Sequence, residues 1–522
     1  MSTTAHEQRF EDVHGISDAV SVMTTSLSKK SDGAQTREEE VVNISGEVEN
    51  RLEQEQIDEG VILEDEFKLH VNPSLIIIIC TNILMQISFF VVVSSSSAYA
   101  AHLGGSATFS GLVIGIPAAV SGASLLPFMK YDKGQYAFPL HFACASLALG
   151  SLLYGLAYKT KFLYLILLGR MVQGLGYTYF MHCKRYCSDS RIVGVRRRTL
   201  LAGWLVVGQG LGLSAGPFIG GLLSKIGFSN DVFNGYSAPG WVMFVVFLIH
   251  WAIVTLYFKD PPREETARQD FELSPRPSSS RIGNALRQLN KRQWGVIATM
   301  CWFALANFFM LGAWEANIPV FTSSHPSMPS AGLTSRSPFN ATSFLYELSP
   351  RDLHRFSSLP FHWSPFAAGN FLALGGITIF PFLLLNMLFS RRTQDRHILA
   401  LGSGLGFSGL LIALALFASQ PAHGTLTYGS FFICWFLVAL GFNLATTCTL
   451  SLLSKQLPPS WNGLTSLAIQ YCNNLGRVCG AVWGGSGVKV GMINYVGLEI
   501  AIVGIGAVMF TTLWKELKTK TG

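Results

Sequence analysis

Long runs of apolar residues alternate with short polar segments along most of this chain. A hydrocarbon core is crossed by about 20 residues of helix, and windows of that length outline twelve predicted spans. They lie at 74–100, 107–128, 137–158, 162–183, 199–224, 240–258, 295–320, 366–389, 397–419, 428–454, 462–487 and 491–514. The pattern predicts an all-α membrane protein of 12 transmembrane helices in two six-helix halves, as in transporters built from a repeated unit around a central path.

The polar segments define the rest of the predicted organisation. It comprises an acidic tail at 1–72, a first half at 73–258, a linker at 259–294, a second half at 295–515 with an insert at 322–364, and a tail at 516–522. The first tail has too few apolar residues to bury a core, so we expect it to be disordered. The insert contains Asn340 in an Asn-Ala-Thr triplet, which is an acceptor for N-glycosylation if the insert is lumenal.

The distribution of Lys and Arg predicts the orientation. Most of these residues in the connecting segments follow the even-numbered spans, so both termini are expected to be cytoplasmic and the insert lumenal. The largest basic cluster is at 184–198 and contains Arg185 and Asp189. The cluster has two open interpretations, an anchor on anionic lipid or a gate. The net charge of +7 follows from this bias and does not indicate nucleic acid binding.

Composition narrows the class of protein. With 522 residues, 49% of them hydrophobic and only 13% charged, the chain does not fit an ordinary soluble globule. It has no pattern of nucleophile and base, no phosphate-binding loop and no His-rich metal motif, so we expect no enzyme activity, cofactor or metal. All nine cysteines lie within or beside the spans. We expect a monomer in a lipid bilayer whose partners are a small solute and protons.

Charged residues inside the predicted spans are few, and they are costly unless they face protein or water. Arg170 and Glu315 fall at similar predicted depths, so the two side chains could pair. Protonation of the glutamate would open the pair and expose the arginine to an anion. The alternative is a permanent pair that locks the two halves together.

Two further charges lie in the last two spans. Arg477 is near the middle of its span, beside two asparagines, and with Arg170 it would form a cationic cradle for an oxyanion. The alternative is that Arg477 caps carbonyl groups of a neighbouring helix. Glu499 is in the last span, and we expect it to bind a partner such as Asn494 or an arginine.

Two motifs resemble those of the major facilitator superfamily. LGRMVQGLG at 168–176, with Arg170, Gln173 and Gly174, resembles its fourth-helix arginine motif. A glycine and proline series resembles the fifth-helix motif of its proton-coupled antiporters, and its glycines permit close helix contact while the proline bends the helix. That series is Gly203, Gly212, Gly216, Pro217, Gly220 and Gly221. The loop motif after the second span survives only around Asp132.

The same resemblance implies that spans one, four, seven and ten line the cavity. On that basis Asn82, Gln86 and Asn307 are candidate pore residues. Gln209, Asn443 and Thr446 are assigned instead to hydrogen bonds between helices, which is the commoner use of such groups in membranes.

A narrower resemblance covers nearly all of the membrane region. The stretches at 152–158, 184–189, 212–217, 312–315 and 475–478 are similar to plant and fungal vacuolar phosphate transporters that carry an SPX domain, and to their lysosomal relatives of the ceroid-lipofuscinosis type. We expect no SPX domain, because the tail ahead of the first span is too short and too acidic for a basic three-helix sensor of inositol phosphates. The resemblance implies an anion such as phosphate as the solute and the vacuolar or another endomembrane as the location.

Three functions therefore remain open. The leading one is a secondary active transporter of a small anion, proton-coupled and working by alternating access. The second is a plasma-membrane proton antiporter that exports an organic compound, supported by the fifth-helix series. The third is a channel or non-transporting sensor built on a transporter fold.

Overall fold

The computed structural model describes residues 73–131, 135–187, 189, 192–193, 195–226, 230–260, 290–323, 361–389, 393–423, 426–457 and 462–518. Contacts divide the chain into two units, Met1–Lys68 and Leu69–Gly522, and every described residue belongs to the second. The predicted tail at 1–72 and most of the linker and the insert lie outside the described residues. Asp132 and Asn340 lie outside them as well.

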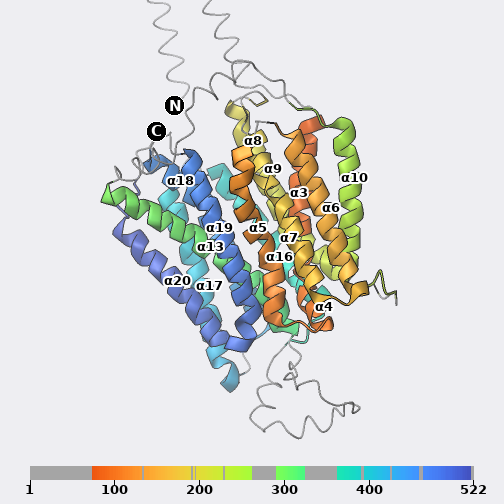
Figure 1. The fold of residues 1–522 in the computed structure, drawn as a ribbon. Helices are drawn as coiled ribbons and strands as arrows, with labels where there is room; N and C mark the ends of the chain where they lie inside the picture. The colour runs from red at the N-terminus through yellow and green to blue at the C-terminus, as the bar shows by residue number, and fades with distance from the viewer. Residues whose placement is uncertain are drawn as a thin grey trace, which may run out of the picture. The chain divides into compact units, whose positions relative to one another are not determined.

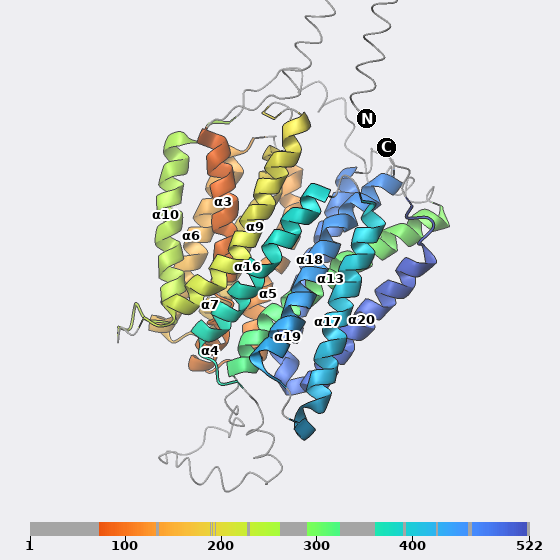
Figure 2. The same ribbon diagram turned by 180° about the vertical axis from the view of Figure 1, so that it is seen from behind.

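The second unit is built from helices in two groups (Figures 1 and 2). The first half contains α3 (Pro73–Phe90), α4 (Ser96–His102), α5 (Ala107–Tyr131), α6 (Ala137–Thr160), α7 (Leu163–Tyr177), α8 (Tyr179–Tyr186), α9 (Val195–Leu223) and α10 (Ala238–Tyr257). The second half contains α13 (Lys291–Ser323), α16 (Pro365–Phe389), α17 (Asp395–His423), α18 (Tyr428–Gln456), α19 (Asn462–Val490) and α20 (Met492–Thr512). The all-helical membrane fold is confirmed.

Two predicted spans are interrupted. The span expected at 74–100 stops at Phe90 and resumes as α4 at Ser96, because three valines and four serines follow one another there. β-branched residues and serines are weaker helix formers than the leucines and alanines around them. The span expected at 162–183 divides into α7 and α8 at Thr178, whose hydroxyl donates to the carbonyl of Leu175 at 2.7 Å.

Ten of the described helices are long and apolar enough to cross a membrane. Of the twelve predicted spans, the fourth and the eleventh are not among these ten. Helix α7 has only 15 residues, and α19 has 29 residues but is the more polar helix, with Asn473, Asn474 and Arg477 near its centre. Arg170 and Arg477 lie on these two helices. The count of twelve spans therefore stays a prediction, because the two helices that do not qualify are the ones that carry the candidate arginines.

Glycine ladders set the closest helix contacts. On α9, Gly212 and Gly216 face Gln86 and Phe90 of α3, and Gly220 faces Val91 just after it, with no room for a side-chain methyl group. A second ladder on α19 faces the backbone of α13 in the same way and was not predicted. Its members are Gly476, Gly480 and Gly484, against Leu305, Phe309 and Ala313.

The two halves meet at α5 with α19 and at α9 with α16. Near the side predicted to be lumenal, Thr108 Oγ1 lies 3.1 Å from Ser486 Oγ, and Lys225 Nζ lies 3.5 Å from the ring centre of Phe366. A methyl group on Gly111 would meet the backbone of Ala481. The halves are therefore in close contact on this side.

The opposite ends of the helices define the side predicted to be cytoplasmic. Lys455 near the end of α18 pairs with Asp395 at the start of α17, and Gln456 donates to the carbonyl of Glu516. Leu517 is fully buried here, so the packed unit includes residues that were expected to form the tail at 516–522.

Candidate functional site

A cavity of about 440 Å³ lies between the two halves. Its walls come from α9, α13, α16, α17, α18 and α19, with Phe90 at the end of α3. It extends from Glu315 and Arg477 to Asp395 and Lys455, where the Lys455 side chain is 49% exposed. The cavity therefore reaches solvent on the side predicted to be cytoplasmic, while the halves touch on the other side.

An ion pair lies at the inner end of this cavity. A guanidinium nitrogen of Arg477 on α19 donates to Oε2 of Glu315 on α13. The side chains are only 12% and 4% exposed, respectively. Such a pair offsets the cost of burying both charges only when its geometry is good, and removal of one partner leaves a buried charge uncompensated.

Aromatic rings of the first half enclose the arginine. Its guanidinium carbon is 4.6 Å from the ring centre of Phe89 and 5.1 Å from that of Phe90, at the end of α3. Cation–π attraction of this kind contributes roughly 0.5–2 kcal/mol. Among the described residues, Nε of Arg477 has no hydrogen-bond partner. The arginine thus joins a carboxylate of its own half to rings of the other half.

The prediction that Arg170 pairs with Glu315 is wrong in this structure. Arg170 is fully buried and donates to the carbonyls of Val113, Ser88 and Phe89 at 3.2–3.5 Å. The last carbonyls of a helix have no partner within the helix, and α3 ends at Phe90. Arg170 therefore stabilises the interruption of α3 rather than lining the cavity.

The prediction compared only the depths of the two residues along the membrane normal. Two residues at the same depth can still lie on helices that do not touch. Helix α7 packs against α5 and α6 inside the first half, whereas Glu315 faces α19. The cationic cradle expected from two arginines is likewise absent from the described part of the cavity, where Arg477 is the inner cation and Arg170 is not a wall residue.

The three candidate pore residues lie outside the described cavity wall. Asn82 donates to the carbonyl of Leu205 at 3.2 Å, and Gln86 packs against Gly212. Asn307 is 1% exposed, and its Nδ2 lacks a hydrogen-bond partner among the described residues. The first two side chains thus serve contacts between α3 and α9.

Three residues that were assigned to helix contacts line the cavity instead. They are Gln209 on α9 and Asn443 and Thr446 on α18. The spacing of Asn443, Thr447, Ser451 and Lys455 places a polar residue at every fourth position of α18, and all four line the cavity. This period of one helical turn is visible in the sequence and was the signal that could have found them.

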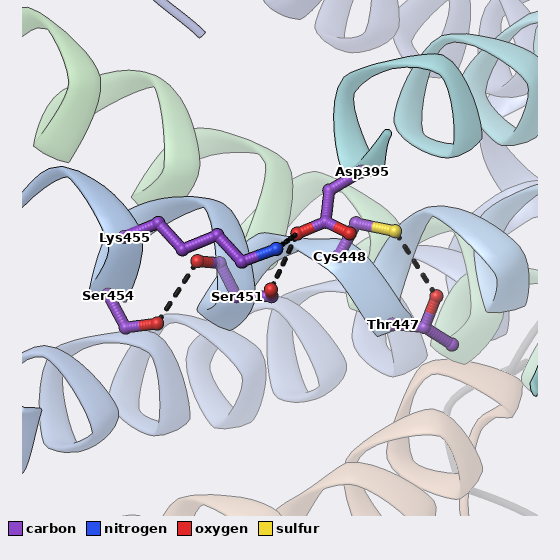
Figure 3. A network of polar contacts seen from close by, with 6 residues as sticks. All are labelled: Asp395, Thr447, Cys448, Ser451, Ser454 and Lys455. Atoms are coloured by element: carbon purple, nitrogen blue, oxygen red, sulfur yellow. Dashed lines mark hydrogen bonds and ion pairs between the residues drawn. The ribbon is translucent and has the colours of Figure 1, made fainter. Parts of the chain in front are cut away.

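A polar network surrounds the mouth of the cavity and was also missed (Figure 3). Lys455 Nζ lies 2.7 Å from Oδ2 of Asp395, and the hydroxyl of Ser451 donates to the same oxygen at 2.5 Å. The wall therefore carries two acids and two bases, each acid paired with a base. With both acids ionised, the formal charges of these four side chains sum to zero.

The motif residues of the fourth helix support Arg170. Gln173 accepts from Arg170 at 2.6 Å and donates to Ser151 at 2.9 Å, and Gly174 packs against Pro117 of α5. These contacts lie within the first half.

The first residues of the basic cluster also pack within the first half. Tyr136 donates to Asp189 at 2.8 Å, and the guanidinium of Arg185 lies 5.9 Å from the Tyr136 ring centre. Of the fifth-helix series, Gly212, Gly216 and Gly220 pack against residues 86–94, whereas Pro217 and Gly221 approach α16 at Gly369 and Phe366. A gating role for any of these residues stays a prediction.

Glu499 is fully buried, and Trp314 Nε1 donates to its Oε2 at 2.9 Å. The expected partner, Asn494, instead donates to the carbonyl of Val490. Trp314 precedes Glu315 in the chain, so two neighbouring residues of α13 bind the acid of α20 and the arginine of α19.

Comparisons with known proteins agree with this architecture. The family model described as Major Facilitator Superfamily matches residues 77–481. An uncharacterized MFS-type transporter of Schizosaccharomyces pombe is 28% identical over 458 residues, covering 86% of this chain and 83% of that protein. An SPX domain-containing membrane protein of Arabidopsis thaliana is 28% identical over 371 residues, covering 68% of this chain and 51% of that protein.

Solved structures show the same fold. A D-xylose-proton symporter superposes with a TM-score of 0.60 at 14% identity, covering 86% of this chain and 99% of the symporter. A peptide transporter in complex with sulfate gives a TM-score of 0.56 at 12% identity, covering 87% and 97% of the two chains. The chain belongs to the Major Facilitator Superfamily, as a multi-pass integral membrane protein of a transporter family.

Proposed function

We propose that this protein couples proton binding to the transport of a small anion by alternating access, with Glu315 and Arg477 as the coupling pair. The observation that supports the proposal is the Glu315–Arg477 ion pair at the inner end of a cavity open on one side. As in the hypothesis from the sequence, protonation of Glu315 opens an ion pair with an arginine. The arginine in this proposal is Arg477 instead of Arg170.

The physical basis is competition for one cation. When Glu315 is ionised, Arg477 is neutralised and a solute anion has no unpaired cation to bind. When Glu315 takes up a proton, the pair loses its attraction and Arg477 can accept an anion through charge-assisted hydrogen bonds. Proton and anion then favour the same state of the site, which is the thermodynamic requirement for coupling.

The alternative of a permanent lock between halves is less well supported. Both partners belong to the second half, on α13 and α19, so the pair does not hold the halves together. Contact with the first half comes from Phe89 and Phe90, which lie over the guanidinium. A change in the charge balance of Arg477 would therefore alter a contact between the halves, and such contacts change when access alternates.

Phosphate is the first solute to test, and the vacuolar or another endomembrane is the favoured location. Both follow from the resemblance to SPX-bearing vacuolar transporters, and the SPX-containing relative of Arabidopsis thaliana supports the assignment to that group. A second candidate is proton-driven export of an organic compound. It is favoured by a cavity of about 440 Å³ with Val206, Leu213 and Leu311 in its wall, a size typical of sites for organic ligands.

The direct test is uptake of radiolabelled phosphate into proteoliposomes that hold the purified protein, with and without an imposed proton gradient. We expect uptake that rises with the gradient and collapses when a protonophore is added. Folded protein that carries no phosphate or other small anion under either condition would contradict the proposal and favour the organic-export function.

A further inference from the structure

We infer that the solute is an organic anion whose body carries hydrogen-bond donors such as hydroxyl groups, rather than bare orthophosphate. This inference rests on the proposed function and narrows its solute class. The observation behind it is the direction of the hydrogen bonds along the α18 wall of the cavity.

Four polar residues of the α18 wall share one feature: each donates a hydrogen to an acceptor of the protein itself. Asn443 donates to the carbonyl of Ala439 at 2.8 Å, Thr446 to that of Asn443 at 2.7 Å, and Thr447 to that of Leu444 at 2.7 Å. The hydroxyl of Ser451 donates to Asp395 at 2.5 Å.

A hydroxyl has one hydrogen to donate and two lone pairs that accept. Once the hydrogen of Thr446 is committed to its own helix, only its oxygen can serve a solute. The same holds for Ser451. The oxygen of Thr447 already accepts from Nδ2 of Asn386 at 3.4 Å, and one of the two hydrogens of the Asn443 amide is committed. Thr446 and Ser451, together with the amide oxygen of Asn443, therefore offer acceptors on this wall, which suit the O–H or N–H groups of a solute and not the oxygens of an anion.

The inner end of the cavity has the opposite character. Arg477 is a pure donor with its Nε unused among the described residues, and Glu315 is its only ion-pair partner there. An anionic group at Arg477 and donor groups along α18 would together match the two ends of the cavity. Orthophosphate has five non-hydrogen atoms, and a cavity of about 440 Å³ corresponds to about fifteen waters at ~30 Å³ each.

The test compares three anions that share one phosphate group. Radiolabelled orthophosphate, propyl phosphate and glycerol 3-phosphate are offered to proteoliposomes under the same proton gradient. The two esters have the same three-carbon chain and differ in two hydroxyl groups. Since each hydrogen bond changes affinity by several-fold, we expect glycerol 3-phosphate to be taken up with kcat/KM about tenfold above propyl phosphate.

A variant pair assigns the preference to the wall. Thr446→Val removes the acceptor oxygen at nearly constant volume, and we expect the preference for glycerol 3-phosphate over propyl phosphate to fall by several-fold. Thr449→Val is the matched control, because Thr449 donates to its own helix at 3.1 Å but is not a wall residue of the described cavity. We expect it to keep the wild-type preference.

The outcomes separate the inference from the function on which it rests. Equal uptake of the two esters, or an unchanged preference in Thr446→Val, overturns the donor-bearing solute while anion transport stands. If none of the three anions is taken up by folded protein under the gradient, the proposed function fails together with the inference.

Discussion

At the scale of residues, two buried arginines have opposite fates. Arg170 donates to three carbonyls and one side-chain amide, all within the first half, and no acid of the described residues pairs with it. Arg477 faces Glu315 and the cavity. Because the donors of Arg170 are already bound to oxygens of the first half, this arginine stabilises the fold. Arg477 is held by one titratable partner, so protonation of Glu315 can release it.

Arg170→Lys should reveal the structural role of the first arginine. An ammonium cannot reproduce the fork that reaches Ser88, Phe89 and Val113 at once. At about 1.5–3 kcal/mol for each hydrogen bond with a charged group, we expect a loss of about 3 kcal/mol or more in stability. Thermal unfolding in detergent measures it. Arg292→Lys is the control, since the Arg292 side chain is 74% exposed, and an equal effect in both variants would refute this assignment.

Trp314→Phe tests the hydrogen bond to Glu499. The change removes the indole N–H that donates to this buried carboxylate, and loss of a partner by a buried charged group costs about 1–3 kcal/mol or more. We expect a lower melting temperature, partly restored by Glu499→Gln. Trp302→Phe removes an indole that donates to a backbone carbonyl and should cost less. Equal losses in the two tryptophan variants would contradict a larger cost for the bond to the Glu499 carboxylate.

At the scale of elements, the two helices with buried arginines are the least like ordinary spans. Helix α7 is short and α19 is polar, and neither is among the ten helices that qualify as spans by length and hydropathy. Glycine ladders compensate in α19, because close backbone contact with α13 adds packing where apolar surface is scarce.

Gly480→Ala should weaken this contact. A methyl group at this position would meet the carbonyl oxygen of Phe309, and overpacking of this kind costs roughly 1–3 kcal/mol. The control is Gly497→Ala on α20, where nothing lies within 4 Å of the added carbon. We expect that variant to be neutral or slightly stabilised. Similar melting temperatures for both variants would contradict the ladder as a close contact.

At the scale of the whole molecule, the halves touch on the side predicted to be lumenal and enclose a cavity open on the other side. Alternating access requires these contacts to open when the cavity closes. The contacts of α5 with α19 and of α9 with α16 are therefore the ones that must change during transport.

A cross-link tests this requirement. The double variant Thr108→Cys with Ser486→Cys places thiols where the two hydroxyl oxygens are 3.1 Å apart. Oxidation should join the halves and stop uptake, and reduction should restore it. Thr108→Cys alone, treated identically, is the control. Undiminished uptake by fully cross-linked protein would mean that this side does not open during transport.

Much of the fold followed from apolar periodicity, because a bilayer imposes length and composition on each span. Because a charge inside a span needs a partner, the sequence indicated that Arg170, Glu315 and Arg477 are important. Their pairing could not be predicted, since the rotation of each helix and its neighbours decide which side chains meet. The interruption of α3 at Phe90 created the carbonyl acceptors that Arg170 binds, and nothing in the apolar pattern indicated them.

The measurement that tests the central claim most directly is gradient-driven anion uptake by Glu315→Gln in proteoliposomes, beside exchange of labelled for unlabelled anion in the same preparation. The anion is whichever of orthophosphate, propyl phosphate and glycerol 3-phosphate the wild type takes up fastest. The amide cannot bind the coupling proton, so we predict that accumulation under a proton gradient is lost while exchange persists. Accumulation that still follows the gradient as in the wild type would contradict Glu315 and Arg477 as the coupling pair.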